Sequence, residues 1–301
     1  MACESAETKR EGSAYRAARP LRFFYRTTVG RILFRPLICR PVSAVAGKFL
    51  DTRLSRGLIP GFVRRNRIDM SQFEEREYRS YNDFFTRRVR EGMRPFSATA
   101  EDFCAPCDSL VSVYSITPDA TFCIKESRYT VRTLLEDAEL AKTFEGGTCV
   151  IFRLGVRDYH RYAYFDDGTI AATRKIRGIF HTVQPIAVER APVFHRNTRE
   201  WTLLHTAHAG EVVYMEVGAM MVGRICNHPV RENVSRGQEK GYFAFGGSTV
   251  IVLFRRGRVT LEEDFWQNTV QGLETPVRQG EVIGWFPALP SDGEGEVSDA
   301  D

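Results

Sequence analysis

The feature that most constrains the fold is a series of short runs of β-branched and aromatic residues that begins after residue 102. Gly, Pro and Asp separate the runs, and one segment at 131–141 has the pattern of a helix instead. Short runs divided by turn residues are typical of antiparallel strands. We therefore predict an α+β protein, with amino-terminal helices followed by a mainly antiparallel β domain. The expected strands are 109–116, 149–154, 162–165, 212–217, 221–225, 249–254 and 282–285.

The chain divides into four predicted parts. Residues 1–67 are cationic and amphipathic, and prolines at 36, 41 and 60 should break them into short helices. Residues 68–100 form a helical segment and linker, in which Asp69 caps one helix and Ser80 or Asn82 caps another that starts at Tyr81. The β-rich domain occupies 101–288, and the acidic tail 289–301 should be disordered.

Charge is concentrated at the start of the chain. Residues 1–67 contain 15 Lys and Arg against 4 Asp and Glu, a net charge of +11, so the net +4 of the whole chain leaves −7 for the rest. Arginines alternate there with apolar residues, as in helices that lie on an anionic membrane. The same pattern also suits a transit peptide, helices packed on the main domain, or a nucleic-acid surface.

The composition indicates in which cellular compartment the protein is found. The chain is 43% hydrophobic but has no run of about 18 apolar residues, and its first 20 residues are too polar for a signal peptide. Seven scattered cysteines suit a reducing cytoplasm, and Cys104-x-x-Cys107 has no second ligand pair to form a zinc site. His205-x-x-His208 has no acidic third ligand nearby. We therefore expect no metal.

A Gly-Ser peptide near the end of the chain carries the strongest chemical signal. Gly246-Gly247-Ser248-Thr249 joins two apolar, strand-like runs. A serine hydroxyl can attack an unhindered glycine carbonyl, and elimination from the resulting ester would leave residue 248 as a pyruvoyl group. Without other motifs, the same four residues would indicate only a glycine bulge or bend in a strand.

Glycine-punctuated hairpins between 210 and 284 suggest a second reading. They have the barrel-sandwich-like pattern of the carrier domains that hold biotin or lipoate. Such a carrier needs a lysine at the tip of an exposed hairpin. Lys240, between Glu239 and Gly241, is a poor match, and a shared fold does not establish a shared function.

Several motifs in order resemble the phosphatidylserine decarboxylases, pyruvoyl-dependent enzymes of phospholipid synthesis. The resemblance covers roughly residues 20–287. Its motifs are Tyr81-Asn82-Asp83-Phe84-Phe85-Thr86-Arg87 with Arg94-Pro95, Ala105-Pro106-Cys107-Asp108-Ser109, Asp158-Tyr159-His160-Arg161, Gly178-Ile179-Phe180-His181-Thr182-Val183-Gln184-Pro185, Asn197-Thr198-Arg199-Glu200, Val217-Gly218-Ala219-Met220-Met221-Val222-Gly223 and Gly246-Gly247-Ser248-Thr249.

The resemblance implies a reaction. Ser248 attacks the Gly247 carbonyl, and the chain separates into fragments 1–247 and 248–301, which stay together as a heterodimer. The pyruvoyl group at 248 condenses with the serine amine of phosphatidylserine and accepts the electrons released with carbon dioxide, giving phosphatidylethanolamine. The resemblance also implies that the protein is a peripheral membrane protein on the cytoplasmic face of the cell membrane, with a homodimer as a possible assembly. We expect no nucleic acid.

Roles follow residue by residue from the resemblance. Asp108 takes the family's acidic position, although Ser109 stands where glycine is common. His160 is expected to hold the substrate carboxylate or donate a proton. Many members carry a second histidine, thought to be the self-cleavage base, where this chain has Ala163. We hypothesise that His181 replaces it, oriented by Asp108, with His160 serving both steps as the alternative.

Arg161 and Arg199 are candidate clamps for phosphate or carboxylate, because a guanidinium matches either anion. Surface or structural ion pairs are the competing interpretation of both. Two other functions stay open for the whole chain. One is a lipid-binding relative that never cuts itself, and the other is a pyruvoyl decarboxylase that acts on a different amino-acid head group.

Overall fold

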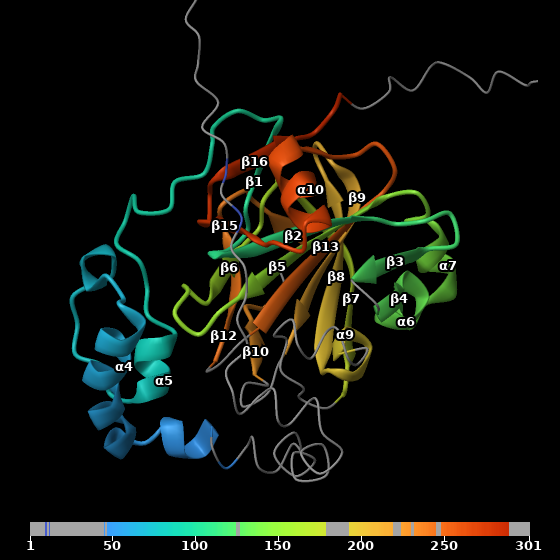
Figure 1. Ribbon diagram of the computed structural model, residues 1–301. Helices are drawn as coiled ribbons and strands as arrows, with labels where there is room; N and C mark the ends of the chain where they lie inside the picture. The colour runs from blue at the N-terminus through green and yellow to red at the C-terminus, as the bar shows by residue number, and fades with distance from the viewer. Residues whose placement is uncertain are drawn as a thin grey trace, which may run out of the picture.

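The computed structural model describes residues 10, 12, 45, 47–124, 127–178, 193–218, 224–229, 232–244 and 248–288. The predicted disorder of 289–301 and most of the cationic segment 1–44 lie outside these residues. Figure 1 shows a layered β domain with a group of helices at one side. The α+β class predicted from the sequence is confirmed.

A small helical module precedes the β domain. It consists of the 3-10 helix η2 (Arg53–Leu58), α4 (Ile59–Asn66), the 3-10 turn η3 (Met70–Gln72) and α5 (Tyr81–Phe85). Pro60 sits in the first turn of α4, where its missing N–H costs nothing. The Ser80 side chain accepts the Asp83 N–H, so Ser80 is the cap of α5.

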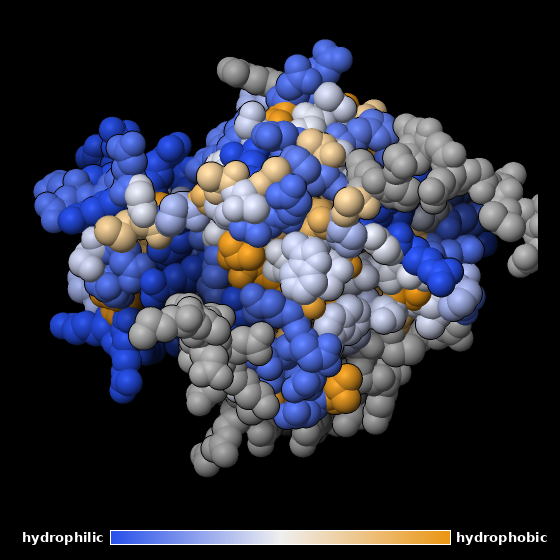
Figure 2. Space-filling view, turned by 90° about the horizontal axis from the view of Figure 1, so that it is seen from above, coloured by the Kyte–Doolittle hydropathy of each residue, from blue (hydrophilic) through white to orange (hydrophobic). Residues whose placement is uncertain are grey.

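The module is held together by aromatic contacts. The Phe62 ring of α4 meets the rings of Tyr81 and Phe84 of α5 edge to face, with centroids 5.3 and 6.1 Å apart. Asp69 caps only the three-residue turn η3, so the longer helix expected from it does not form. Seen from above, the module is the lobe at the left of Figure 2 and is mainly hydrophilic on that face.

An eight-stranded antiparallel sheet forms the centre of the β domain. Its strand order is β11-β7-β8-β9-β13-β5-β2-β15. The bounds are β2 (Ser109–Ser115), β5 (Thr148–Leu154), β7 (Gly168–Ile176), β8 (Arg199–Thr206), β9 (Gly210–Val217), β11 (Asn233–Val234), β13 (Ser248–Phe254) and β15 (Thr275–Val277). All seven residues of β13 are buried, because other elements cover both faces of the sheet.

Different elements cover the two faces. The face of Ile251 and Leu253 packs against a hydrophobic core under α6 (Val131–Leu135), α7 (Ala138–Lys142), α9 (Val193–Arg196) and the hairpin of β3 (Thr121–Ile124) and β4 (Ser127–Thr130). The face of Val250 and Val252 packs against a second core under α10 (Glu263–Val270) and two small sheets. These are β10-β12-β6 (Ile225–Asn227, Glu239–Phe243, Arg161–Ala163) and β1-β16-β14 (Asp102–Cys104, Val282–Trp285, Thr260–Leu261).

Two local expectations need correction, and a third is not tested. The single helix expected at 131–141 is two short helices, because Glu136 ends α6 in a left-handed conformation (φ 52°) and Asp137 caps α7. Strands β7 and β8 had not been predicted. Most of β7 is exposed, so it lacks an apolar face that would reveal it. The strand expected at 221–225 lies outside the described residues except for Arg224 and Ile225, and Ile225 begins β10.

Candidate active site

Ser248 lies at the first position of the central strand β13. It pairs with Leu154 of β5, and the next residue, Thr249, pairs with Val217 of β9. By strand alternation Ser248 points toward the same face as Val250. Ser248 and Thr249 are fully buried, and neither side-chain oxygen has a hydrogen-bond partner within the described chain.

The residues expected around Ser248 collect at the same edge of the sheet. Ser109 begins β2 beside the end of β5, so Asp108 lies one step past the edge. On the other side of β13, the Gly218 N–H donates to the Thr198 carbonyl at 2.9 Å. Three of the sequence motifs therefore converge where β13 starts.

Asp108 is fixed by two donors. Arg94 binds its carboxylate through two nitrogens, with Nε to Oδ1 at 2.8 Å and Nη2 to Oδ2 at 2.6 Å. The Gln279 N–H donates to Oδ1 at 2.8 Å. A bidentate arginine pair holds both the position and the plane of a carboxylate. Within the described residues these are the groups that hold Asp108, and a histidine is not among them.

His160 is buried in the layer that covers the face of Ser248. Its ring lies 4.1 Å from the Phe85 ring of α5, centroid to centroid. Its Nδ1 is 2.8 Å from the Asp158 carbonyl. A carbonyl can only accept, so Nδ1 carries the proton and Nε2 is the basic nitrogen. The Phe243 N–H donates to the His160 carbonyl at 2.9 Å and ties the residue to β12.

The Asp158 carboxylate closes the loop that leads to His160. Its Oδ2 accepts the Gly155 N–H at 2.7 Å. Burial is the main cause that raises the pKa of Asp158 to about 6, and the nearby Asp108 contributes in the same direction. This loop therefore holds a carboxylate that titrates close to neutral pH.

The other predicted residues are distributed more widely. Arg161 donates to the Thr86 carbonyl at 2.9 Å and to Glu239 at 2.7 Å. Arg199 is buried on the opposite face of the sheet, where it donates to the Leu134 and Thr133 carbonyls under α6. The structure does not bring Arg199 together with His160. His181 and Gly247 lie outside the described residues.

Comparison with known proteins decides the family. A model of the phosphatidylserine decarboxylase family matches residues 81–285. The chain belongs to the phosphatidylserine decarboxylase family. The resemblance stated from the motifs is thereby confirmed, as is the predicted enzyme class, because this is a family of carboxy-lyases.

Individual relatives support the same assignment. The chain is 42% identical to phosphatidylserine decarboxylase proenzyme 2 of Clostridium acetobutylicum, over 88% of this chain and 91% of the relative. It is 37% identical to the phosphatidylserine decarboxylase proenzyme of Ruminiclostridium cellulolyticum, over 88% and 91%. For the proenzyme of Clostridium tetani the identity is 38%, over 80% and 83%.

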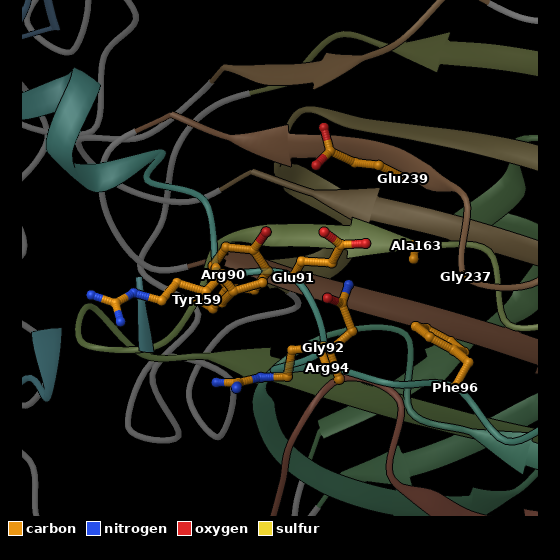
Figure 3. Close-up of a pocket in the computed structure, with 11 residues that line it drawn as sticks. Arg90, Glu91, Gly92, Arg94, Phe96, Tyr159, Ala163, Gly237 and Glu239 are labelled. Carbon is orange, nitrogen blue, oxygen red and sulfur yellow. The ribbon is translucent and has the colours of Figure 1, made fainter. Parts of the chain in front are cut away.

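Ala163, where many members of the phosphatidylserine decarboxylase family carry histidine, borders a polar pocket of about 210 Å³. Figure 3 shows the side chains that line it, which include Arg94 of the linker and Glu239 of β12. The linker residue Arg94 therefore links this pocket to Asp108. Sequence reasoning quoted Arg94 as a motif residue but did not identify it as the partner of Asp108.

A buried ion pair lies between the large sheet and β12, and sequence reasoning missed it. β12 bulges between Glu239 and Gly241, and Lys240 is the extra residue. The Lys240 ammonium lies 2.7 Å from Glu216 of β9. Asn227 donates to Glu216 at 3.0 Å and accepts from the Tyr162 hydroxyl at 2.9 Å. Since Lys240 is 3% exposed, it is not the exposed hairpin lysine of a carrier domain.

The cysteine and histidine motifs singled out in the sequence have the following environments. Cys104 and Cys107 are buried free thiols, and burial raises the pKa of Cys107 well above its usual value. His208 contacts Asp166 at 2.7 Å. In the part of the chain that the structure describes, no cluster of three or more His, Cys, Asp or Glu residues is arranged to hold a metal ion.

Proposed function

We propose that this protein decarboxylates phosphatidylserine to phosphatidylethanolamine with a pyruvoyl group made from its own Ser248. The observation that carries the proposal is the buried hydroxyl at the first position of the central strand. The motif spacing and the word proenzyme in the names of the relatives support a chain that is cut to become active. The cut is expected between Gly247 and Ser248, giving fragments 1–247 and 248–301.

The residues present fit such a group. A pyruvoyl group made from residue 248 needs no separate binding site, because β13 already holds that residue between β5 and β9. A buried hydroxyl without a partner costs roughly 1–3 kcal/mol and calls for an explanation. Conversion of Ser248 would remove this hydroxyl. The pyruvoyl group would supply a ketone that takes up the substrate amine and withdraws electrons as carbon dioxide leaves.

Self-cleavage needs a base near Ser248. We assign this role to His181, oriented by Asp108, and keep His160 as the alternative base for both steps. Three hydrogen bonds from Arg94 and Gln279 hold the Asp108 carboxylate in place, which supports a role for Asp108 in orienting the base. His160 suits the decarboxylation step, because its proton on Nδ1 leaves Nε2 to accept or donate at the substrate.

The structure supports a substrate-binding role better for Arg161 than for Arg199. Arg161 lies next to His160 and its guanidinium also stacks over the Tyr242 ring at 4.9 Å. Arg161 forms an ion pair with Glu239, and a substrate anion could replace the Glu239 carboxylate as its partner. Arg199 already donates to carbonyl groups inside the protein, so its role as a clamp rests on the resemblance alone.

The helical module, together with Phe49 in the helical residues 47–50 just before it, supports peripheral docking on an anionic membrane. Phe49, Leu54 and Leu58 are 50%, 83% and 48% exposed, and they alternate with arginines such as Arg53 and Arg56. Apolar side chains beside guanidinium groups suit the boundary between acyl chains and lipid phosphates. None of the helices that the structure describes is long and apolar enough to cross a membrane. We place the enzyme on the cytoplasmic face, and the homodimer remains a prediction.

Docking is tested by cosedimentation with vesicles. We expect binding to phosphatidylglycerol-containing vesicles to exceed binding to pure phosphatidylcholine, and to weaken in high salt. The variant Leu54→Asp should lose most of the binding, while Val270→Asp, which changes an equally exposed residue on α10, should keep it. Equal loss in both variants would contradict docking through the module.

Intact mass spectrometry of the purified protein beside Ser248→Ala tests the catalytic proposal first. Two fragments that divide after residue 247, with the smaller one reactive toward hydroxylamine, are expected from the unmodified chain and not from the variant. His181→Ala should block the cut and His160→Ala should not. Release of carbon dioxide from phosphatidylserine vesicles, but not from free serine, tests the substrate. A single uncut and inactive chain would favour the non-catalytic lipid-binding relative instead.

A further inference from the structure

Arg87, immediately after helix α5, is a buried cation that the proposed chemistry does not use. It has no exposed surface. Its guanidinium lies between two aromatic rings, 4.3 Å from the Phe73 centroid and 5.0 Å from the Phe84 centroid. Burial is the main cause that lowers the pKa of Arg87 to about 10. A group in this position must be held there against a large desolvation cost.

Its polar partners are few. Nη2 donates to the carbonyl oxygens of Arg157 and Asp158, at 3.1 and 3.5 Å. Nε and Nη1 have no hydrogen-bond partner, and no carboxylate forms an ion pair with Arg87 in the part of the chain that the structure describes. An apolar side chain of similar length would fill the space between the two rings at lower cost. Stability therefore does not explain why an arginine stands at this position.

The two residues before Arg87 contact the same loop. The Phe85 ring lies against the His160 ring. The Thr86 carbonyl accepts the Arg161 Nε at 2.9 Å. The last residue of α5 and the two residues after it thus contact the segment 157–161 at three places: the 157 and 158 carbonyls, the His160 ring and the Arg161 side chain.

One carbonyl connects Arg87 to His160. The Asp158 oxygen accepts from Arg87 Nη2 and also from His160 Nδ1 at 2.8 Å. A cation that donates to a carbonyl fixes the direction of that carbonyl, and the carbonyl in turn selects the tautomer and the orientation of the imidazole. The Asp158 side chain holds the other end of this turn through Gly155.

We propose that Arg87 is a positioning residue for His160, which holds the Asp158 carbonyl so that the imidazole keeps Nδ1 protonated and presents Nε2 to the substrate. This inference rests on the proposed role of His160 in decarboxylation. It adds that the His160 ring must be oriented as well as present. The ring must be held by a donor that follows α5 in the chain, outside the β domain that carries both His160 and Ser248.

The variant Arg87→Met tests this, because methionine keeps an apolar stem between Phe73 and Phe84 and removes the donors. The matched control is Arg88→Met, the same change at the next residue, which is exposed. We expect Arg87→Met to unfold at the same temperature as the unmodified protein or a higher one, and to cut itself normally. Its kcat for decarboxylation should fall about 10- to 100-fold, as for a misplaced catalytic group. Arg88→Met should stay within about twofold.

Two readouts separate positioning from a general structural role. In the His160→Ala background, Arg87→Met should cause no further loss of kcat, because the two changes act on one step. In uncut Ser248→Ala protein, the NMR signals and the pKa of the His160 ring should change with Arg87→Met and not with Arg88→Met. If Arg87→Met does not fold, Arg87→Lys, which keeps the charge and a single donor group without the planar guanidinium, should give an intermediate kcat.

Either of two results would overturn the proposal. One is a kcat within twofold in folded Arg87→Met, and the other is an equal loss with and without His160. Failure of the proposed function itself looks different, because the unmodified protein would then release no carbon dioxide from phosphatidylserine. The NMR comparison in the uncut protein would still decide whether Arg87 orients the ring.

Discussion

We expect the protein to lose much more stability when one member of the buried pair Glu216 and Lys240 is removed than when both are replaced by apolar residues. Glu216 has no exposed surface and Lys240 is 3% exposed. The single variant Lys240→Met leaves a carboxylate enclosed between the large sheet and β12. Removing one member of such a pair typically costs about 3–5 kcal/mol, because the remaining charge is buried and uncompensated. For a chain of 301 residues, at about 2.1 cal/mol/K of unfolding entropy per residue, that corresponds to a fall of roughly 5–8 °C in Tm.

The double variant Glu216→Leu with Lys240→Met should recover most of the loss. It removes both charges and fills a layer already lined by Tyr164 and Tyr214, whose rings lie 5.9 and 5.2 Å from the Lys240 ammonium. Asn227 would lose one acceptor but keep Glu200 at 2.9 Å. We therefore expect the double variant to stay within about 1–2 kcal/mol of the unmodified chain.

The assay is thermal unfolding in the Ser248→Ala background, in which the proposed cut cannot occur and every molecule is expected to be a single chain. The pH gives a further check. Burial raises the pKa of Glu216, and Lys240 opposes this shift. Without Lys240 the folded state favours the protonated carboxyl more strongly, so stability is lost as pH rises above the ordinary range of a glutamate carboxyl. A single variant as stable as the unmodified protein, or a double variant no better than the single one, would refute this reasoning.

Two further predictions concern other charged groups. Burial raises the pKa of Asp158 from 3.8 to about 6, so the folded state favours the protonated form and stability falls as pH rises from about 4 to 6, by roughly 2–3 kcal/mol. Asp158→Asn should flatten this fall in urea unfolding curves, and an unchanged curve would contradict the shift. Arg10 contacts Glu262 at 2.6 Å, Glu281 and the Val282 carbonyl, all within the fragment 248–301. Arg10→Glu should lower stability by about 1 kcal/mol, most clearly at low salt, with Arg88→Glu as the exposed control. An effect that does not depend on salt would point to packing of this segment instead.

Much of the fold could be predicted because its signals are local. The β13 segment is a continuous apolar run, and the alternating Ser109–Ser115 segment forms β2. Strand β7 could not be recognised, because most of its residues face solvent and its place in the sheet depends on the pairing with β8. The single helix at 131–141 was wrong because apolar periodicity does not reveal that Glu136 adopts a left-handed conformation.

The candidate site residues come from the motifs and their roles stay predictions, whereas the contacts that hold them were not predicted. Motif order gave Asp108, His160 and Ser248 as candidates, and the register of β13, β5 and β2 brings Ser248 and Asp108 to one edge of the sheet. The donors that hold these groups could not be found, since Arg94 lies 14 residues before its partner Asp108 and Arg87 lies 71 residues before Asp158. Contacts over such separations depend on how the helical module sits on the β domain, and local patterns carry no information about that.

The central position of β13 has a consequence for the life of the molecule. A cut before Ser248 would leave the smaller fragment hydrogen-bonded to β5 on one side and to β9 on the other. The fragment could leave only if the eight-stranded sheet opened along its middle. On the proposed mechanism, an enzyme built in this way could not exchange its reactive group as other enzymes exchange a dissociable cofactor. Each molecule would acquire that group once, when it is made, and chemical damage at residue 248 could be repaired only by synthesis of a new chain.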